Sequence, residues 1–223
     1  MKSMREAYNS TLPYRIVGAL LFFGLLGVRD WMRNPTNPTR VKEYGFLVVS
    51  MLLSVVYGIL HDHLTATISV EYFLNAKGLG TDPRPYRWAV TLLAIKASYG
   101  PGVLAGALIL IANNPSKRKP QLPYRHLFRF CAYPVLGAAT CAAILGAAMP
   151  LIARGTWIVD AALAFAPAES VGRFLTVWGI HAGSYGGATL GTVIAVISVV
   201  AARNSLASRP SLPCDNRSSM LPV

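Results

Sequence analysis

The chain has 223 residues, of which 53% are hydrophobic and only 13% are charged, and its formal net charge is +12. This composition excludes an ordinary soluble domain, whose charged share is about 25%. The basic residues lie in short connections beside long apolar segments, as in membrane proteins, and no RNA- or DNA-binding motif accompanies them. We therefore expect the lipid bilayer, and not nucleic acid, as the main partner.

Residues 1–43 are expected to form a basic N-terminal segment with a short hydrophobic helix at 16–28. This apolar run has 13 residues between Arg15 and Arg29, fewer than the ~20 that a transmembrane helix needs. It can span the membrane if Arg15 snorkels, or it can lie in the interface. Both interpretations stay open, and so does the side of the membrane on which the N-terminus lies.

Residues 44–202 hold apolar segments long enough to cross a bilayer. The predicted fold class is all-α: an integral membrane bundle of four principal transmembrane helices, with the short N-terminal helix in addition. The expected helices cover about 44–68, 88–112, 126–152 and 174–202.

The first of these helices carries a polar stripe. On a helical wheel its members fall within an arc of roughly 140°. Lipid cannot satisfy such groups, so the stripe must face protein or water, and the other helices are expected to pack against it. The stripe consists of Ser50, Ser54, Tyr57, His61, Asp62, Thr65, Ser69 and Tyr72.

The last helix has a glycine at every fourth position, a glycine zipper. Small residues at this spacing let two helices approach closely. The partner helix can lie in the same bundle, in a second copy of the chain, or in another protein of a membrane complex. The four positions are Gly179, Gly183, Gly187 and Gly191.

The basic connections predict the orientation. Lys and Arg concentrate at 29–42, at 117–129 and in the C-terminal tail, all on one side of the predicted bundle. That side is expected to be cytoplasmic. Residues 203–223 are rich in Ser, Pro and Asn and are predicted to form a disordered cytoplasmic tail. The expected location is a multi-pass position in a bacterial inner membrane.

Helix rise then predicts a polar cluster in the outer half of the bundle. At 1.5 Å per residue, ionisable groups from three separate helices reach similar depths. Each is costly there unless it is paired or hydrated. Lys96 either snorkels to the headgroups or pairs with Asp62 or Glu71. The expected cluster is Tyr57, His61, Asp62, Thr65, Glu71, Lys96, His181 and Tyr185.

The same residues suggest a metal site. His61 and His181, with Asp62 or Glu71, offer ligands that suit a transition metal ion. A haem held between the two histidines is a second, weaker option. The spacing along the chain does not choose between these options, because the ligands come from different helices.

Three classes of function remain open. The first is a non-enzymatic membrane protein whose cluster has a structural, sensing, or small-ligand or ion-binding role. The second is a transporter or channel component for protons, metal ions or small solutes. The third is a membrane-embedded metal or haem redox enzyme. The sequence has no Gly-rich phosphate loop, nucleophile elbow or His-Glu-x-x-His motif. Of the three classes we favour the first.

Three short motifs carry a resemblance. They are His61-Asp62-x-x-Thr65, Glu71-Tyr72-Phe73 and His181-x-x-Ser184-Tyr185. Together they resemble a pattern in a family of small, uncharacterised polytopic membrane proteins from bacteria. The resemblance covers mainly the first and fourth principal helices. It supports the choice of these positions and implies no activity.

Overall fold

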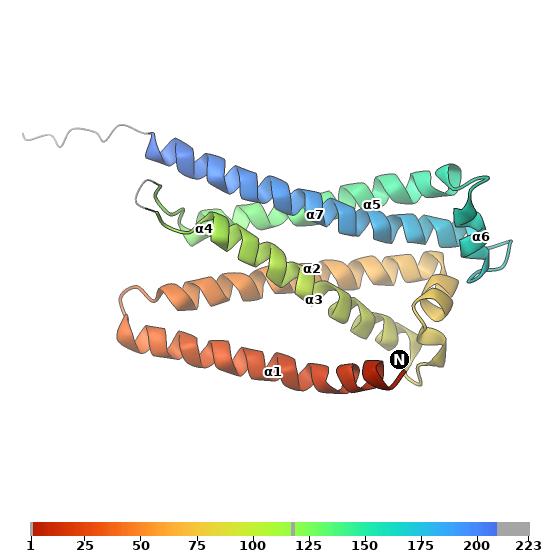
Figure 1. Ribbon diagram of the computed structural model, residues 1–223, viewed down its shortest axis with the longest axis horizontal. Helices are drawn as coiled ribbons and strands as arrows, with labels where there is room; N and C mark the ends of the chain where they lie inside the picture. The colour runs from red at the N-terminus through yellow and green to blue at the C-terminus, as the bar shows by residue number, and fades with distance from the viewer. Residues whose placement is uncertain (1, 117–118, 209–223) are drawn as a thin grey trace, which may run out of the picture.

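The computed structural model describes residues 2–116 and 119–208, and Figure 1 shows its long helices side by side. These residues form helices and no β-strand, which confirms the all-α prediction. Short π- or 3-10 turns follow α2 at Tyr72–Ala76 and Leu79–Thr81 and precede α5 at Phe128–Cys131. The α-helices are α1 (Lys2–Arg33), α2 (Thr39–Ile68), α3 (Tyr86–Ala112), α4 (Tyr124–Leu127), α5 (Ala132–Ile152), α6 (Trp157–Leu163) and α7 (Val171–Ala207).

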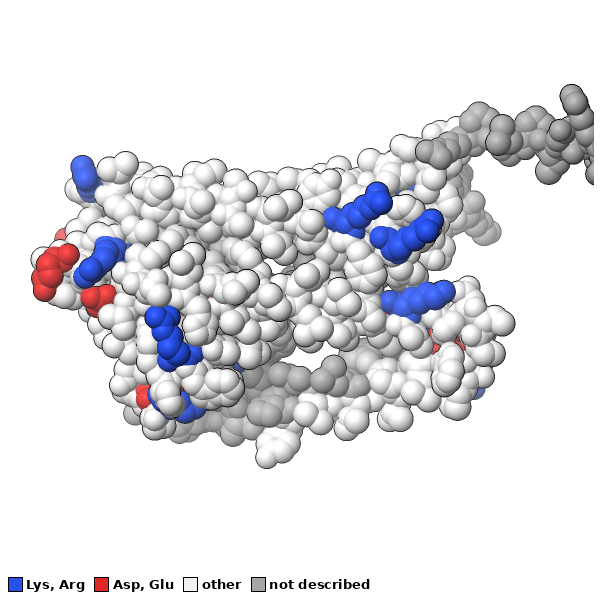
Figure 2. Space-filling view, turned by 180° about the vertical axis from the view of Figure 1, so that it is seen from behind, with Lys and Arg blue, Asp and Glu red and all other residues white. Residues whose placement is uncertain are grey.

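Four helical segments of the described chain are long and apolar enough to cross a membrane, as predicted. They are α2, α3, the stretch Tyr124–Ile152 that contains α5, and α7. Figure 2 shows charged side chains near the two ends of the visible face and an uncharged belt between them. A hydrocarbon core requires such a belt, because it cannot solvate charge. The protein is therefore a helical integral membrane protein.

The bundle is built from two closely packed helix pairs, α2 with α3 and α5 with α7. Small residues allow this packing. A Cβ added at Gly102 or Gly106 of α3 would lie less than 3.0 Å from Ser54 or Ser50 of α2. All four glycines of the predicted zipper face α5 in the same way, and Gly187 meets the backbone of Gly137. Within the chain, α5 thus covers the glycine face of α7.

Hydrophobic clusters join the two pairs at both ends of the bundle. At one end Phe73 and Phe174 pack with Val90 and Val177. At the other end lies a second cluster that contains Phe46, Ile109, Leu127, Ala195 and Val199. The part of the polar stripe from Ser50 to Asp62 lies on α2 between these clusters, whereas Tyr72 belongs to the first cluster.

The N-terminal helix differs from the prediction of 16–28. It extends from Lys2 to Arg33 and ends immediately before Asn34-Pro35, which breaks the helix. It lies along α2, with the ring of Phe23 5.2 Å from that of Tyr44. Its apolar side chains are largely exposed where they are described, between Tyr14 and Met32, and α1 is not among the four candidate spans.

The C-terminal boundary also differs. α7 continues to Ala207, so the first residues of the predicted tail are helical, and residues 209–223 lie outside the described part. Arg203 is buried, and its guanidinium donates to the carbonyl oxygens of Ala112, Asn114, Lys119 and Pro120. These carbonyls belong to the end of α3 and the loop after it, where no helical N–H is available to them. Arg203 thus fastens α7 to that loop.

Candidate functional site

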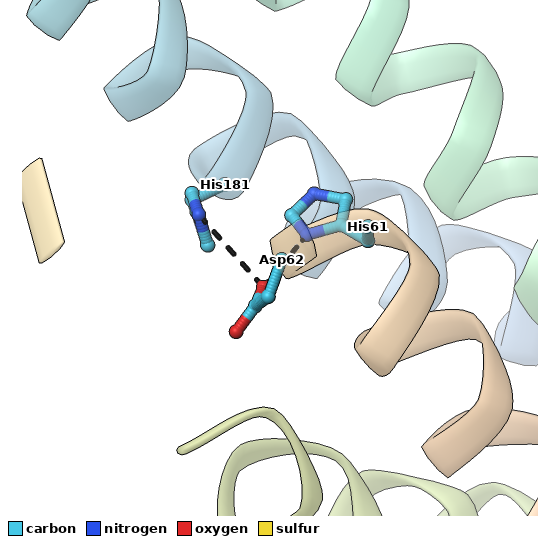
Figure 3. A group of neighbouring side chains, drawn as sticks. All are labelled: His61, Asp62 and His181. Atoms are coloured by element: carbon cyan, nitrogen blue, oxygen red, sulfur yellow. Dashed lines mark hydrogen bonds and ion pairs between the residues drawn. The ribbon is translucent and has the colours of Figure 1, made fainter. Parts of the chain in front are cut away.

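The candidate site lies where the C-terminal part of α2 meets the N-terminal part of α7. Figure 3 shows His61 and Asp62 on α2 opposite His181 on α7. His61 Nδ1 lies 2.9 Å from Asp62 Oδ1, and His181 Nε2 lies 3.9 Å from the same oxygen. All three side chains are at least nine-tenths buried, with exposed fractions of 7–9%. The chain thus brings residues 119 positions apart into one cluster, which we call the His/Asp cluster.

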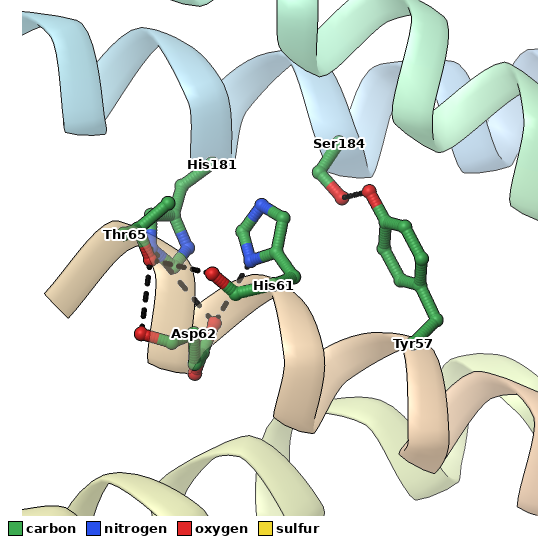
Figure 4. Close-up of polar contacts among 6 residues, drawn as sticks. All are labelled: Tyr57, His61, Asp62, Thr65, His181 and Ser184. Carbon is green, nitrogen blue, oxygen red and sulfur yellow. Dashed lines mark hydrogen bonds and ion pairs between the residues drawn. The ribbon is translucent and has the colours of Figure 1, made fainter. Parts of the chain in front are cut away.

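One nitrogen of His61 has no partner. Nδ1 of His61 forms the 2.9 Å hydrogen bond with Asp62, and it is the donor in the tautomer that carries its hydrogen on Nδ1. The other nitrogen, Nε2, is buried and makes no hydrogen bond. Figure 4 shows it directed away from Asp62. A buried polar atom without a partner costs about 1–3 kcal/mol, so this atom is suited to a ligand.

His181 is held from two sides. On one side the Thr65 hydroxyl donates to the His61 carbonyl oxygen at 2.9 Å, and it lies 3.4 Å from His181 Nε2 (Figure 4). On the other side the Tyr72 ring stacks on the imidazole, with centroids 4.7 Å apart and planes at 24°. Phe73 adds an edge contact at 5.8 Å. The π-helical turn after α2 therefore places two aromatic rings over the cluster, where they exclude water.

A second polar contact joins the same two helices about one turn away. The hydroxyl of Tyr57 lies 3.0 Å from that of Ser184 (Figure 4). The neighbouring Tyr185, which was expected in the cluster, has an exposed fraction of 51%. Ser184 follows His181 by three positions, so a helical wheel places both on one face. That spacing was the available signal for Ser184.

A cavity of about 340 Å³ lies beside the cluster, between the two helix pairs. His61, Asp62 and His181 line one end of it, and Ser50 and Cys131 line the other. Its wall is mostly apolar. The cavity therefore follows the polar stripe of α2 through the middle of the bundle.

Glu71 does not join the cluster. α2 ends at Ile68, and the extended backbone of Ser69 turns the chain away from the helix axis. Glu71 accepts a hydrogen bond from the Ser69 hydroxyl at 2.8 Å. Hydrogen bonding by its own backbone N–H, and then by the hydroxyls of Ser69 and Ser170, lowers the pKa of the Glu71 carboxyl. Glu71 was one of the two carboxylates expected as a metal ligand, but it lies in the loop after α2 and is hydrogen-bonded to Ser69. Asp62 is the carboxylate that lies beside the two histidines.

Lys96 is also separate from the cluster. It is exposed, and no ion pair with Asp62 or Glu71 occurs among the described residues. α3 presents its small residues to α2, since a Cβ at Gly58 would meet Ser98 and the carbonyl of Ala94. Lys96 lies between these two positions in sequence and therefore on another face of the helix. The snorkelling interpretation fits this placement, and the expected ion pair is absent.

The His/Asp cluster has the geometry of a loose three-ligand set. His61, Asp62 and His181 each offer one ligand atom, and these atoms lie within 4.8 Å of one another. Imidazole nitrogen and carboxylate oxygen suit zinc and related transition metals. Haem fits poorly, because axial histidines lie on opposite faces of the porphyrin. Here the two imidazoles are in edge contact, with centroids 4.7 Å apart and no space for a macrocycle.

Fold and site together define the class: an all-α integral membrane protein with a buried His/Asp cluster between two transmembrane helices. Comparison of the chain with protein-family models, with curated proteins and with solved structures gives no match in any of the three. The function of this protein must therefore be inferred from the site alone.

Proposed function

We propose that this chain is a non-enzymatic membrane protein that binds one divalent transition metal ion of the zinc type. The ligands are His61 Nδ1, a carboxylate oxygen of Asp62 and His181 Nε2. The observation that carries the proposal is that His61, Asp62 and His181 each bring one ligand atom to within 4.8 Å of the others at a buried position in the bundle.

Electrostatics supports a cation at this point. Among the described residues, Asp62 has only the two histidines as charge partners and no Lys or Arg. A carboxylate buried inside a membrane bundle without a counter-charge is strongly disfavoured. A divalent ion supplies that charge, and the neutral imidazoles complete its coordination.

The adjustment needed is small. Zinc ligands at about 2.0–2.1 Å in a tetrahedron lie roughly 3.4 Å from one another. The cluster reaches that spacing if its longest separation, at most 4.8 Å, shortens by about 1.4 Å. Binding displaces the hydrogen of His61 Nδ1, and the neutral imidazole then carries its hydrogen on Nε2. Three protein ligands leave a fourth position for water or another small ligand.

The test compares two histidines of the same helix. His63 is a matched control, because it lies two residues after His61 but hydrogen-bonds Thr91 of α3 at 2.9 Å. The protein is purified in detergent, stripped with chelator, reloaded with zinc chloride and measured by elemental analysis and titration calorimetry. We expect one zinc per chain, a loss of affinity of about 100-fold or more in His181→Gln, and no loss in His63→Gln.

Helical content measured by circular dichroism separates loss of a ligand from loss of the fold. Asp62→Asn is a second variant that keeps the side-chain shape and removes the charge. Folded wild-type protein without stoichiometric zinc would overturn the proposal. So would zinc binding that survives in both His181→Gln and Asp62→Asn.

A further inference from the structure

The cavity beside the cluster exists because of how the helix pairs pack. Glycines allow α3 to pack closely against α2 and α5 against α7, whereas few contacts join one helix pair to the other. Hydrophobic clusters close the bundle at both ends. The space left between the pairs is about 340 Å³, within the range of natural small-molecule sites.

The cavity reaches the lipid-facing surface of the bundle. Leu104 and Leu108 of α3 and Val193 of α7 line it, and 60%, 39% and 50% of these residues are exposed. All three lie within candidate membrane spans. Their exposed surfaces therefore face acyl chains, and a molecule dissolved in the bilayer can enter between α3 and α7.

Most polar groups of the wall are already engaged. Ser50 donates to its own helix at Phe46, and Ser54 donates to the carbonyl oxygen of Ser98. Tyr57 is paired with Ser184. In a mostly apolar wall with these hydroxyls engaged, ions would find few partners, so the cavity is poorly suited to conducting them.

Among the buried side-chain atoms without a hydrogen-bond partner in the described residues, His61 Nε2 is the one that belongs to a residue lining this cavity. The side chain of His61 is only 9% exposed. Nε2 accepts a hydrogen bond while Nδ1 carries the hydrogen, and it donates one when Nδ1 binds a metal. A hydroxyl group both donates and accepts, so it satisfies Nε2 in either case.

We propose that this cavity binds a lipid-soluble molecule with an apolar body and a single hydroxyl head, which enters from the bilayer and hydrogen-bonds His61 Nε2. The apolar body lies between α3, α5 and α7, and the head lies at the His/Asp cluster. Binding uses a nitrogen that the proposed metal does not occupy, so it does not depend on the metal.

The experiment uses two photoreactive probes in proteoliposomes of the full chain: dodecanol with a terminal diazirine, and the same diazirine on dodecane. Cross-linked positions are mapped by mass spectrometry. We expect the alcohol to label cavity-lining residues about 3- to 10-fold more than the alkane, as loss of one hydrogen bond predicts. His61→Phe should abolish this difference, and His63→Phe should keep it.

A second pair of variants tests the space itself. Ala105 lines the cavity and Ala107 does not, although both lie on α3. Ala105→Phe should reduce labelling by the alcohol, and Ala107→Phe should not. His181→Gln removes a proposed metal ligand and keeps His61. If the alcohol still labels the cavity of this variant, the alcohol binds without the metal, and the two proposals are tested independently. Equal labelling by alcohol and alkane, or labelling unaffected by both His61→Phe and Ala105→Phe, would overturn the cavity proposal.

Discussion

Gly186 and Gly187 are adjacent on α7, but only Gly187 lies against α5, and this difference gives a testable prediction. A Cβ added at Gly187 would lie 2.6 Å from the carbonyl carbon of Gly137 and 2.7 Å from Cys141 Cβ, whereas a Cβ at Gly186 meets nothing within 4 Å. Gly187→Ala should therefore destabilise the fold, and Gly186→Ala should not.

The magnitude follows from two effects. Replacing Gly by Ala in a helix contributes about 1 kcal/mol of stability through propensity, and both variants share this gain. Overpacking costs roughly 1–3 kcal/mol, and only Gly187→Ala incurs it. The nearest atoms are backbone, which cannot rotate aside, so α5 and α7 must separate. The two variants should differ by about 1–3 kcal/mol in the free energy of unfolding.

Unfolding by SDS in mixed micelles, followed by circular dichroism, measures this difference. Because the substitutions are identical and adjacent, effects on the unfolded chain largely cancel. Equal unfolding free energies for the two variants, within about 0.5 kcal/mol, would refute the close approach of α5 and α7 at this position.

Two further predictions concern the ends of the bundle. Arg203→Gln should lower the unfolding free energy by roughly 2–4 kcal/mol, because several carbonyls lose their donor, and Arg203→Lys should lower it less; equal stability of wild type and both variants in thermal denaturation would contradict this. At Glu71 the folded-state pKa is lowered, so its carboxylate stabilises the fold above its unfolded pKa, and this stabilisation is lost as the pH falls from the unfolded pKa through the lower folded pKa. Glu71→Gln should remove that part of the acid sensitivity, which a thermal melting series across this range measures, and an unchanged pH profile would contradict it.

The sequence predicted the fold well because the bilayer imposes strong rules. An apolar run of sufficient length must be a helix, since its backbone has no other partner in lipid. The four principal helices follow from this rule alone. The length of α1 did not follow, because residues before Arg15 are polar enough to leave the start of the helix undetermined by hydropathy.

The meeting of α2 and α7 was also within reach of the sequence. Helix rise placed His61 and His181 at similar depths, and a polar stripe must face protein, so the two should lie near each other. The structure brings them to a ring-centroid distance of 4.7 Å. Glu71 lies apart from the cluster because the chain leaves the helix axis at Ser69, directly after the predicted end of the helix, whereas the predicted polar stripe extended the helical wheel to Tyr72.

Arg203 shows the limit of compositional reasoning. Its surroundings of Ser, Asn and Pro resemble a disordered tail, yet α7 continues to Ala207. The reason is tertiary: carbonyls at the end of α3 need donors, and only the folded structure brings them to this guanidinium. The residue spacing along the chain therefore does not reveal that Arg203 pairs with these carbonyl groups.

The two proposals share a mechanical consequence. Inside each helix pair, glycines fix the separation sterically, whereas α2 and α7 meet in the middle of the bundle through polar contacts of Asp62 and Tyr57 with His181 and Ser184. Drawing the three metal ligands together from within 4.8 Å therefore moves one pair toward the other and leaves both glycine contacts intact. Because the cavity lies between the same pairs, the metal proposal predicts a change in cavity volume when zinc is added, while the hydroxyl contact at His61 Nε2 stays possible with or without the ion.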